Sequence, residues 1–470
     1  VVPYNLDGQP ATIDADSSKL KRWSNGIRLS GDHLSFEGFE IAFHAAGGRI
    51  MRVGTNATFC AFRRNTVYGT TNGLKASWRL TDAVLEDNRV FRVVGAGLQV
   101  GSHFQRVLVR NNTLIDNGPC QPFTGQSSAT EGHPFNMNRY GGGDDATNLQ
   151  FLNNLVISTD NARRYGVMRC KGGVANLEMR GNILVGGSPN IYAAPEKPGH
   201  LIGNTIVGGS LYIGTSASGK EYNPEIADNL SLKSDEIAAA RFANIAKHDY
   251  RLLPDSPHLG SGALPEATKI LFVNPQAAAG GDGTLPEKAF TTLAAALQGT
   301  LPDTIYLAAG TYQERINLNC ATELHLTSAG DGEVVLNGGE INLSGTGKIK
   351  FSDLVWRDSQ LSAQNGNCRF ENCVFSAGSL TATGTRLELL NNTFLDNCKI
   401  SATPERAVLR NNLFIMSQPA LAVKAGSICS ENNCFSGTAA TAALQSWQQS
   451  VTEAWPSFQA AVELSPDYRL

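Results

Sequence analysis

Apolar and polar residues alternate around a repeated asparagine along most of this chain. The segment VLVRNNTL has apolar residues five and three positions before Asn112 and another two positions after it. Variants of this pattern surround nine other asparagines, which are Asn65, Asn88, Asn154, Asn182, Asn204, Asn229, Asn392, Asn412 and Asn433. Their spacings are 23, 24, 42, 28, 22 and 25 residues in the first group, and 20 and 21 in the second. Such spacings are typical of a solenoid of stacked repeats.

The alternation on both sides of each asparagine has the period of a β-strand, so each repeat is predicted to contain two short strands that meet at a corner. Asn suits a corner because it tolerates left-handed backbone and its amide can bond to the next repeat. A third strand is predicted about thirteen residues upstream. Its inward positions are Met51 and Val53, Leu74 and Ala76, Leu98 and Val100, and Met168 and Cys170.

Three short strands per turn and a ladder of asparagines resemble the right-handed parallel β-helix of pectate-lyase-like proteins. The resemblance covers most of the chain and implies an all-β fold with a long stacked core. It implies no single activity, because this fold hosts lyases, hydrolases, epimerases, phage tailspikes and adhesins.

A second start of the same fold lies in mid-chain. Leu271–Pro275, the turn GGDGT, a predicted helix over Thr291–Gln298 and the sequence AGTY resemble the N-terminal cap of pectate-lyase-like β-helices. The sequence therefore predicts two tandem right-handed parallel β-helix domains with short capping helices, over residues 1–265 and 266–470. The first domain is expected to lack its N-terminal cap, and the second is expected to be clipped after a helical tail over Ala442–Val462.

Composition narrows the range of partners. Charged residues make up 17% of the 470 residues and the net charge is −3, so no polycationic face for nucleic acid is expected. The sequence contains no run of eighteen apolar residues, the length needed to span a membrane. The nine cysteines form no CxxC pair and are predicted to be small buried hydrophobes. A protein of this kind is expected to be extracellular, on the cell surface or in the periplasm, although no export signal is visible.

Cations line the predicted outward face of the upstream strand in the first domain. Arg52, Lys75, Gln99 and Arg169 each stand thirteen residues before a ladder asparagine, and Lys171 follows two residues after Arg169. Two aromatic residues on the following repeats, Tyr192 and Tyr212, could stack on sugar rings. The equivalent positions of the second domain are Ser379, Lys399 and Ala420, which are nearly featureless. A solenoid face is a long groove that suits a polymer, so the first domain is the candidate for a polysaccharide site.

The one large insertion, between Asn112 and Asn154, adds further candidates. Its polar residues are Glu131, His133, Asn136, Asn138, Arg139, Tyr140, Asp144 and Asp145. If the insertion supplies the strand between those of Gln99 and Arg169, Asn136 and Asn138 fall on the outward face, with Arg139 and Tyr140 at its edge. Long insertions on solenoids often build the functional site.

These residue types fit β-elimination on a uronate polymer. The reaction needs a cation or Ca²⁺ to neutralise the carboxylate, a base for the C5 proton and an acid for the leaving oxygen. We assign Lys75, Arg169, His133 and Tyr140 to catalysis. Asp144 and Asp145 are assigned to Ca²⁺, which prefers carboxylate oxygens. The predicted substrate-binding residues are Arg52, Gln99, Arg139, Lys171, Tyr192 and Tyr212.

Two alternatives stay open. Glycoside hydrolysis needs two carboxylates that flank the bond, and adjacent Asp144 and Asp145 are similar to the paired aspartates of polygalacturonase-like hydrolases. The Asn-Thr-Asp, Gly-His-Gly and Arg-Ile-Lys motifs of that family are absent, however, and so is the Asp-Pro-His-Asp motif of mannuronan epimerases. The other alternative is a non-catalytic protein that binds glycan or serves as an adhesive or structural β-helix.

Overall fold

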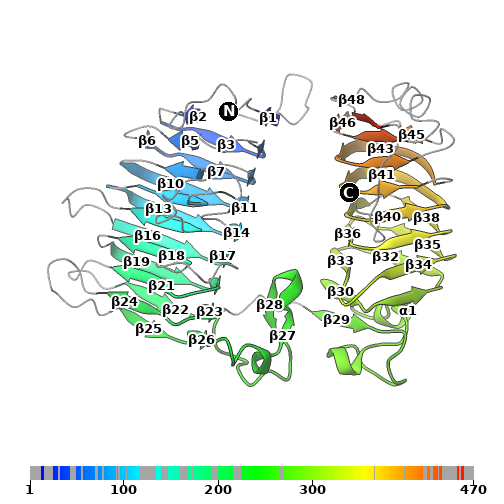
Figure 1. Cartoon of the computed structure of the whole chain (residues 1–470), viewed down its shortest axis with the longest axis horizontal. Helices are drawn as coiled ribbons and strands as arrows, with labels where there is room; N and C mark the ends of the chain where they lie inside the picture. Colours follow the sequence, from blue (N-terminus) through cyan, green and yellow to red (C-terminus); the bar gives the residue numbers. More distant parts are fainter. Residues whose placement is uncertain are drawn as a thin grey trace. The chain divides into compact units, whose positions relative to one another are not determined.

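A computed structural model of the chain consists almost entirely of short parallel strands stacked in successive turns (Figure 1). It is a parallel β-helix fold, as the resemblance implied. The contact pattern divides the chain into two compact units, which are described separately: unit 1 is Val1–Phe242 with Tyr250–Pro265, and unit 2 is Ala243–Asp249 with Glu266–Leu470. The structure describes residues 12–14, 25–29, 32–42, 49–53, 57–68, 72–76, 79–91, 93, 96–101, 103–115, 134–138, 147–158, 167–171, 174–192, 199–214, 224–263, 269–364, 366–395, 398–415, 421–423, 427–431, 433–436, 453–454 and 457–459.

Unit 1 has three parallel sheets, named here in the order in which each turn of the chain crosses them. The first sheet contains β2 (Asn25–Leu29), β5 (Arg49–Val53), β9 (Asn72–Ala76), β12 (Leu98–Val100), β15 (Phe135–Asn138), β18 (Met168–Lys171), β21 (Pro189–Tyr192) and β24 (Tyr212–Gly214). The second sheet contains β3 (Ser35–Glu37), β7 (Ala61–Arg63), β10 (Leu80–Glu86), β13 (Gln105–Arg110), β16 (Thr147–Leu152), β19 (Ala175–Arg180), β22 (His200–Ile202) and β25 (Glu225–Ala227), with β6 (Ala57–Thr58) beside β10.

The third sheet of unit 1 follows the asparagine corner. It contains β1 (Thr12–Asp14), β4 (Glu40–Ala42), β8 (Thr66–Tyr68), β11 (Arg89–Phe91), β14 (Thr113–Ile115), β17 (Leu155–Ile157), β20 (Ile183–Val185), β23 (Thr205–Val207) and β26 (Leu230–Leu232). A two-stranded sheet follows, of β27 (Phe242–Asn244) and β28 (Asp249–Leu252).

Unit 2 repeats this plan, but its first and second sheets are joined. Strands β41 (Ser379–Leu390) and β43 (Lys399–Arg410) run without a break through both. The other first-sheet strands are β32 (Ile316–Asn319), β35 (Glu340–Ser344), β38 (Gln360–Gln364) and β45 (Leu421–Val423). The second-sheet strands are β29 (Ile270–Val273), β30 (Thr304–Leu307), β33 (Glu323–Ser328), β36 (Lys348–Ser352), β39 (Asn367–Glu371), β46 (Ser427–Glu431) and β48 (Glu453–Ala454).

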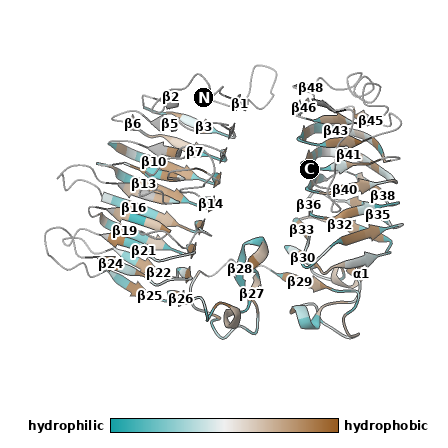
Figure 2. Ribbon diagram, in the orientation of Figure 1, coloured by the Kyte–Doolittle hydropathy of each residue, from teal (hydrophilic) through white to brown (hydrophobic). Residues whose placement is uncertain are grey.

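The third sheet of unit 2 contains β31 (Gly310–Tyr312), β34 (Val334–Asn337), β37 (Val355–Arg357), β40 (Val374–Ser376), β42 (Thr393–Phe394), β44 (Leu413–Ile415), β47 (Cys434–Ser436) and β49 (Ser457–Gln459). Figure 2 shows apolar residues in brown among paler and teal residues along the strands of both units. In unit 2 the buried rings of Phe375, Phe394, Phe414 and Phe435 stack with centroids 4.8, 5.0 and 5.1 Å apart. The phenylalanines two positions after Asn392, Asn412 and Asn433 therefore fill the core of unit 2 together with Phe375.

The predicted asparagine ladder is confirmed. In unit 1 each side-chain amide from Asn65 to Asn204 donates a hydrogen bond of 2.9–3.0 Å to the Oδ1 atom of the next ladder asparagine, ending at Asn229. In unit 2 Asn392, Asn412 and Asn433 form the same ladder, with bonds of 3.1 and 2.9 Å. All ladder residues from Asn65 to Asn204 are buried.

One reason given for asparagine at the corner is wrong. The left-handed backbone belongs to the residue before the ladder position, as at Asn111 (φ 55°), Asn153 (φ 52°) and Gly181 (φ 63°). The ladder asparagines themselves are not among the described residues with positive φ. Their role is to satisfy buried backbone groups: the amide of Asn154 also donates to the carbonyl of Val109 at 3.0 Å.

Unit 2 begins with the predicted cap. The helix is shorter than expected, because α1 spans only Leu293–Ala296. Thr292 caps it by accepting a hydrogen bond from the Ala295 amide, and the Glu314 carboxylate accepts 2.7 Å bonds from the amides of Leu293 and Ala294. A carboxylate at the first turn satisfies amides that have no partner inside the helix.

Two helix predictions differ from the structure. The segment Ile237–Lys247, whose sequence suggests a helix, instead contains two short 3-10 turns, Ala238–Ala240 and Ile245–Lys247, on either side of β27. The predicted helical tail contains β48 and β49, which pair with β46 and β47. In both places, sheet pairing overrides a local preference for helix. Of the eight cysteines that the structure describes, seven are buried free thiols as predicted, and Cys434 is only partly buried.

Unit 2 contains a partly buried histidine whose titration predicts a pH effect. Burial, and then the nearby Lys350, lower the pKa of His325 to about 4, from an ordinary value of 6.5. The ring Nε2 atom lies 2.9 Å from the hydroxyl of Ser352. Because the folded state binds this proton more weakly than the unfolded chain does, the stability is complete above about pH 6.5 and is lost as the pH falls toward 4.

We expect the free energy of unfolding of unit 2 to decrease by about 2 kcal/mol between pH 6.5 and pH 4. Denaturant titrations at several pH values measure this loss. His325→Gln should flatten the pH dependence in that range, since Gln has no proton to bind. An unchanged slope in the variant would show that other groups cause the effect, such as Glu371 and Asp353, which face the same ring.

Candidate functional site

Strand pairing places the predicted cationic residues in one line on the first sheet of unit 1. Neighbouring strands match Arg52 with Lys75, Lys75 with Gln99, Gln99 with Asn136 and Asn136 with Arg169. The prediction that the insertion supplies the strand between those of Gln99 and Arg169 is therefore confirmed, and that strand is β15. Strands of a sheet lie about 4.8 Å apart, so these positions form a continuous line, called here the outward column.

The outward column is longer than the sequence analysis indicated. Arg28 pairs with Arg52 at one end, and Asn190 and Tyr212 continue from Arg169 at the other. Arg28 was missed, although it stands between Ile27 and Leu29 in an alternating segment. No Asp or Glu stands at any of the column positions on the described strands β2, β5, β9, β12, β15, β18, β21 and β24.

A second column runs beside the first, two residues further along each strand. It places Asn138 next to Lys171, and Tyr192 next to Gly214. Because Cys170 pairs with Ile191, Lys171 lies level with Tyr192. The two predicted aromatic residues thus stand in different columns: Tyr212 lies in line with Arg169, and Tyr192 lies in line with Lys171.

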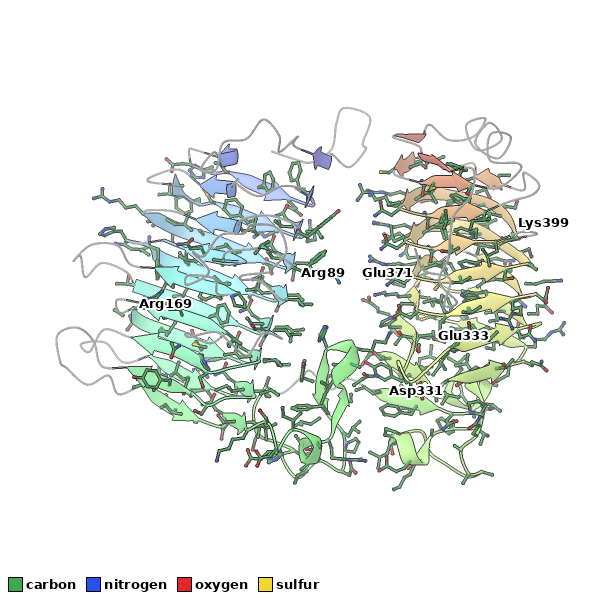
Figure 3. All side chains as sticks on the ribbon, viewed as in Figure 1. Arg89, Arg169, Asp331, Glu333, Glu371 and Lys399 are labelled. Atoms are coloured by element: carbon green, nitrogen blue, oxygen red, sulfur yellow. The ribbon has the colours of Figure 1, made fainter. Side chains whose placement is uncertain are left out.

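The described side chains of the outward column differ in how exposed they are. Arg169, labelled in Figure 3, is half-buried, whereas its chain neighbours Met168 and Cys170 are fully buried. Tyr212 is 51% exposed, whereas Gln99 is only 6% exposed. Gln99 is therefore covered, although an outward substrate-binding residue is expected to be open to solvent.

Several predicted site residues lie outside the described residues: His133, Arg139, Tyr140, Asp144 and Asp145. For Arg52, Lys75, Lys171 and Tyr192 the structure gives the position of the backbone in the sheet. Among the described residues, no group of three or more His, Cys, Asp or Glu side chains could hold a metal. The calcium site at Asp144 and Asp145 thus stays a prediction.

On the neighbouring second sheet of unit 1, several basic residues lie beside carboxylates. Glu86 accepts hydrogen bonds from Arg110 at 2.5 Å and Arg63 at 3.2 Å, and these bonds, that from Arg110 foremost, hold the pKa of its carboxyl below its ordinary value. Arg106 pairs with Asp82, and further ion pairs join Arg180 to Glu178 and His200 to Glu225. A shallow depression of about 400 Å³ follows this face, lined by Arg106, Leu108, Asn148, Gln150, Asn176, Glu178 and His200.

This contrast decides which face suits an acidic ligand. On the second sheet each named arginine already has a carboxylate of this chain beside it, so an added anion would have to displace that carboxylate. On the first sheet, four basic residues, Arg28, Arg52, Lys75 and Arg169, share a column with only uncharged residues. A polymer with regularly spaced carboxylates would match a line of regularly spaced cations.

Comparisons with known proteins give no family for this chain. No known family matches the sequence, and neither does any curated protein. The solved structures include a PL6 family alginate lyase, AlyGC, to which the chain is similar over 90% of its own length and 88% of that protein's, with 11% identity and a TM-score of 0.21. We draw nothing about activity from a likeness at this level. Within the described residues, no helix is long and apolar enough to cross a membrane.

Proposed function

We propose that unit 1 binds an acidic polysaccharide along the outward column and cleaves it by β-elimination. The observation that carries this proposal is the strand pairing that aligns Arg28, Arg52, Lys75 and Arg169 without a carboxylate in the same line. Substrate contacts are assigned to Arg52, Arg139, Lys171, Tyr192 and Tyr212, and no longer to Gln99, because its side chain is covered. Such a protein acts where such polymers occur, outside the cell, at its surface or in the periplasm.

The proposed reaction needs three kinds of group: a cation, a base and an acid. Arg169 or Lys75 neutralises the uronate carboxylate, so that the carbanion formed at C5 is stabilised. A base removes the C5 proton, and an acid protonates the oxygen that leaves C4. We assign these two roles to His133 and Tyr140, and Lys75 is a further candidate for the base. The electron pair from the C5–H bond forms the C4–C5 double bond as the C4–O bond breaks.

A calcium ion held by Asp144 and Asp145 would supply further positive charge next to the carboxylate. Hydrolysis by this aspartate pair, and glycan binding without cleavage, are the two competing outcomes. The three possibilities differ in their products: elimination gives a reducing end and an unsaturated non-reducing end, hydrolysis gives a reducing end and a saturated non-reducing end, and binding alone gives no product.

A substrate screen tests the proposal. The whole chain is incubated with alginate, pectate and glycosaminoglycans, with and without a chelator, while ultraviolet absorbance and reducing ends are measured. We expect absorbance from the new double bond to rise in step with reducing ends for at least one polymer. Reducing ends without absorbance would indicate a hydrolase, and retention of a polymer without any product would indicate a binder. Loss of activity with chelator, restored by added Ca²⁺, would support the metal assignment.

A further inference from the structure

The first sheet of unit 2 carries two lines of uncharged hydrogen-bonding residues. Strand pairing aligns Asn317, Asn342, Ser362, Thr381 and Ser401 in one line. Two residues further along the same strands stand Asn319, Ser344, Gln364, Thr383 and Thr403. We call these two lines the polar columns. The sequence analysis singled out only the neighbouring line of Ser379 and Lys399, which are indeed paired.

The polar columns face outward and are accessible. The residues between them, Leu318, Leu343, Ala363, Ala382 and Ala402, are all buried, as strand alternation requires. Gln364, Thr381, Thr383 and Thr403 are exposed. A shallow depression of about 350 Å³ runs over three adjacent strands and is lined by Asn317, Leu318, Asn319, Asn342, Leu343, Ser344, Ser362 and Gln364.

The lack of charge is specific to this sheet. Outward positions of the adjoining second sheet are dominated by ion pairs, including Lys350 with Glu371 at 3.0 Å and Lys348 with Glu323 at 2.8 Å. None of the ten residues of the polar columns is charged. At one edge of the columns, Glu340 is paired with Arg315. Charged side chains therefore occur on other surfaces of unit 2 but are absent from these two lines.

The polar columns also retain hydrogen-bonding capacity. Asn342 donates to Asn317 at 3.0 Å and to Glu340 at 3.2 Å, and Ser344 donates to the Leu318 carbonyl at 3.4 Å. Within the described part of the chain, the side chains of Ser362, Gln364 and Thr381 make no hydrogen bond to protein. Amides and hydroxyls both donate and accept, so the columns match a ligand that carries hydroxyl groups at regular intervals and no charge.

We propose that the polar columns of unit 2 bind a neutral, hydroxyl-rich polysaccharide. This goes beyond the function proposed for unit 1, because the ligand differs in charge and the residues lie in the other unit. The strand spacing of about 4.8 Å repeats the same hydrogen-bonding groups along the sheet. A chain laid across several strands would make many weak bonds of one kind, and each of them replaces a bond to water.

Affinity electrophoresis of the whole chain in gels that contain a neutral polysaccharide tests this proposal. Xylan, glucomannan, galactomannan and mixed-linkage β-glucan serve as probes, and a gel without polysaccharide sets the baseline. We expect at least one neutral polymer to retard the protein. The double variant Asn342→Ala with Gln364→Ala should weaken that retardation about tenfold, because several hydrogen bonds are lost. Both side chains lie outside the core, so the thermal midpoint should stay the same.

Two control variants separate this site from other surfaces. Lys348→Ala changes the second sheet of unit 2, and Arg169→Ala changes the outward column of unit 1; both should be retarded like the unaltered protein. Failure of all neutral probes to retard the protein would overturn the proposal, as would equal retardation of the double variant. Neither result bears on cleavage of a uronate polymer by unit 1, which is measured separately.

Discussion

Arg169→Ala is expected to lower the rate of uronate polymer cleavage by about a hundredfold or more. Removing one group that stabilises the charge of a transition state commonly costs this much. Arg169 is the only basic residue of the outward column whose side chain the structure describes, and its neighbours Met168 and Cys170 are buried. The change should therefore leave the core and the thermal midpoint intact. Initial rates of double-bond absorbance, with substrate near and above KM, measure the loss.

The matched control is Arg180→Ala. Arg180 lies in the same turn of unit 1 but on the second sheet, where it is paired with Glu178 at 2.6 Å. We expect this variant to keep nearly the full rate, because only a surface ion pair is lost. Equal losses in both variants would point to a general effect of positive charge. Full activity of Arg169→Ala would remove Arg169 from the site. Lys75→Ala and His133→Ala test the other assigned roles in the same assay.

Asn154→Ala is expected to destabilise unit 1 by about 3–5 kcal/mol. The Asn154 Oδ1 atom accepts bonds of 3.0 Å from both the backbone amide and the side-chain amide of Asn112. Its own amide donates to Val109 and to Asn182, both at 3.0 Å. Truncation leaves these buried groups without partners, and water cannot reach them. Denaturant titration followed by circular dichroism measures the free energy of unfolding.

Asn319→Ala provides the comparison for that result. Asn319 is an asparagine at an exposed position of unit 2, outside the ladder. Its replacement should change the stability by less than about 0.5 kcal/mol. If Asn154→Ala lowers the free energy of unfolding no more than Asn319→Ala does, the ladder is a consequence of stacking rather than a cause of stability.

The core residues and the corners of the β-helix could be predicted from the local pattern of apolar and polar residues. Each ladder asparagine has apolar neighbours at fixed offsets, and each offset corresponds to one inward side chain of a short strand. Leu74, Leu98 and Met168 are buried as predicted. The strand in the insertion could be predicted for the same reason, because Phe135 and Met137 flank Asn136 with strand alternation.

Counting back from the corner fails where a turn changes length. Gln99 and Arg169 stand thirteen residues before their ladder asparagines, but thirteen residues before Asn204 is Ile191, which is buried. The turn after β21 holds one more residue, and the turn after β24 is longer again. As a result, Asn190 and Tyr212 continue the outward column and Tyr192 does not. Turn length depends on loop packing, which the period of the strands does not encode.

The polar columns of unit 2 escaped the sequence analysis for a similar reason. Counting thirteen residues back from each ladder asparagine selects one outward position on each strand. A strand of five residues, however, has two or three outward positions. A single Ser, Thr or Asn also does not indicate a binding site, since these residues are common at exposed strand positions. Only the pairing of adjacent strands shows that ten such residues form two unbroken lines.

The most direct test of the central claim is the origin of the oxygen at the cleaved bond. The polymer that responds in the substrate screen is digested in water labelled with heavy oxygen, and the products are weighed by mass spectrometry. Elimination adds no water, so we predict products without label from the cleavage step, together with a double bond in the sugar at the new non-reducing end. Heavy oxygen incorporated once per cleavage, with no double bond, would contradict elimination and establish hydrolysis instead.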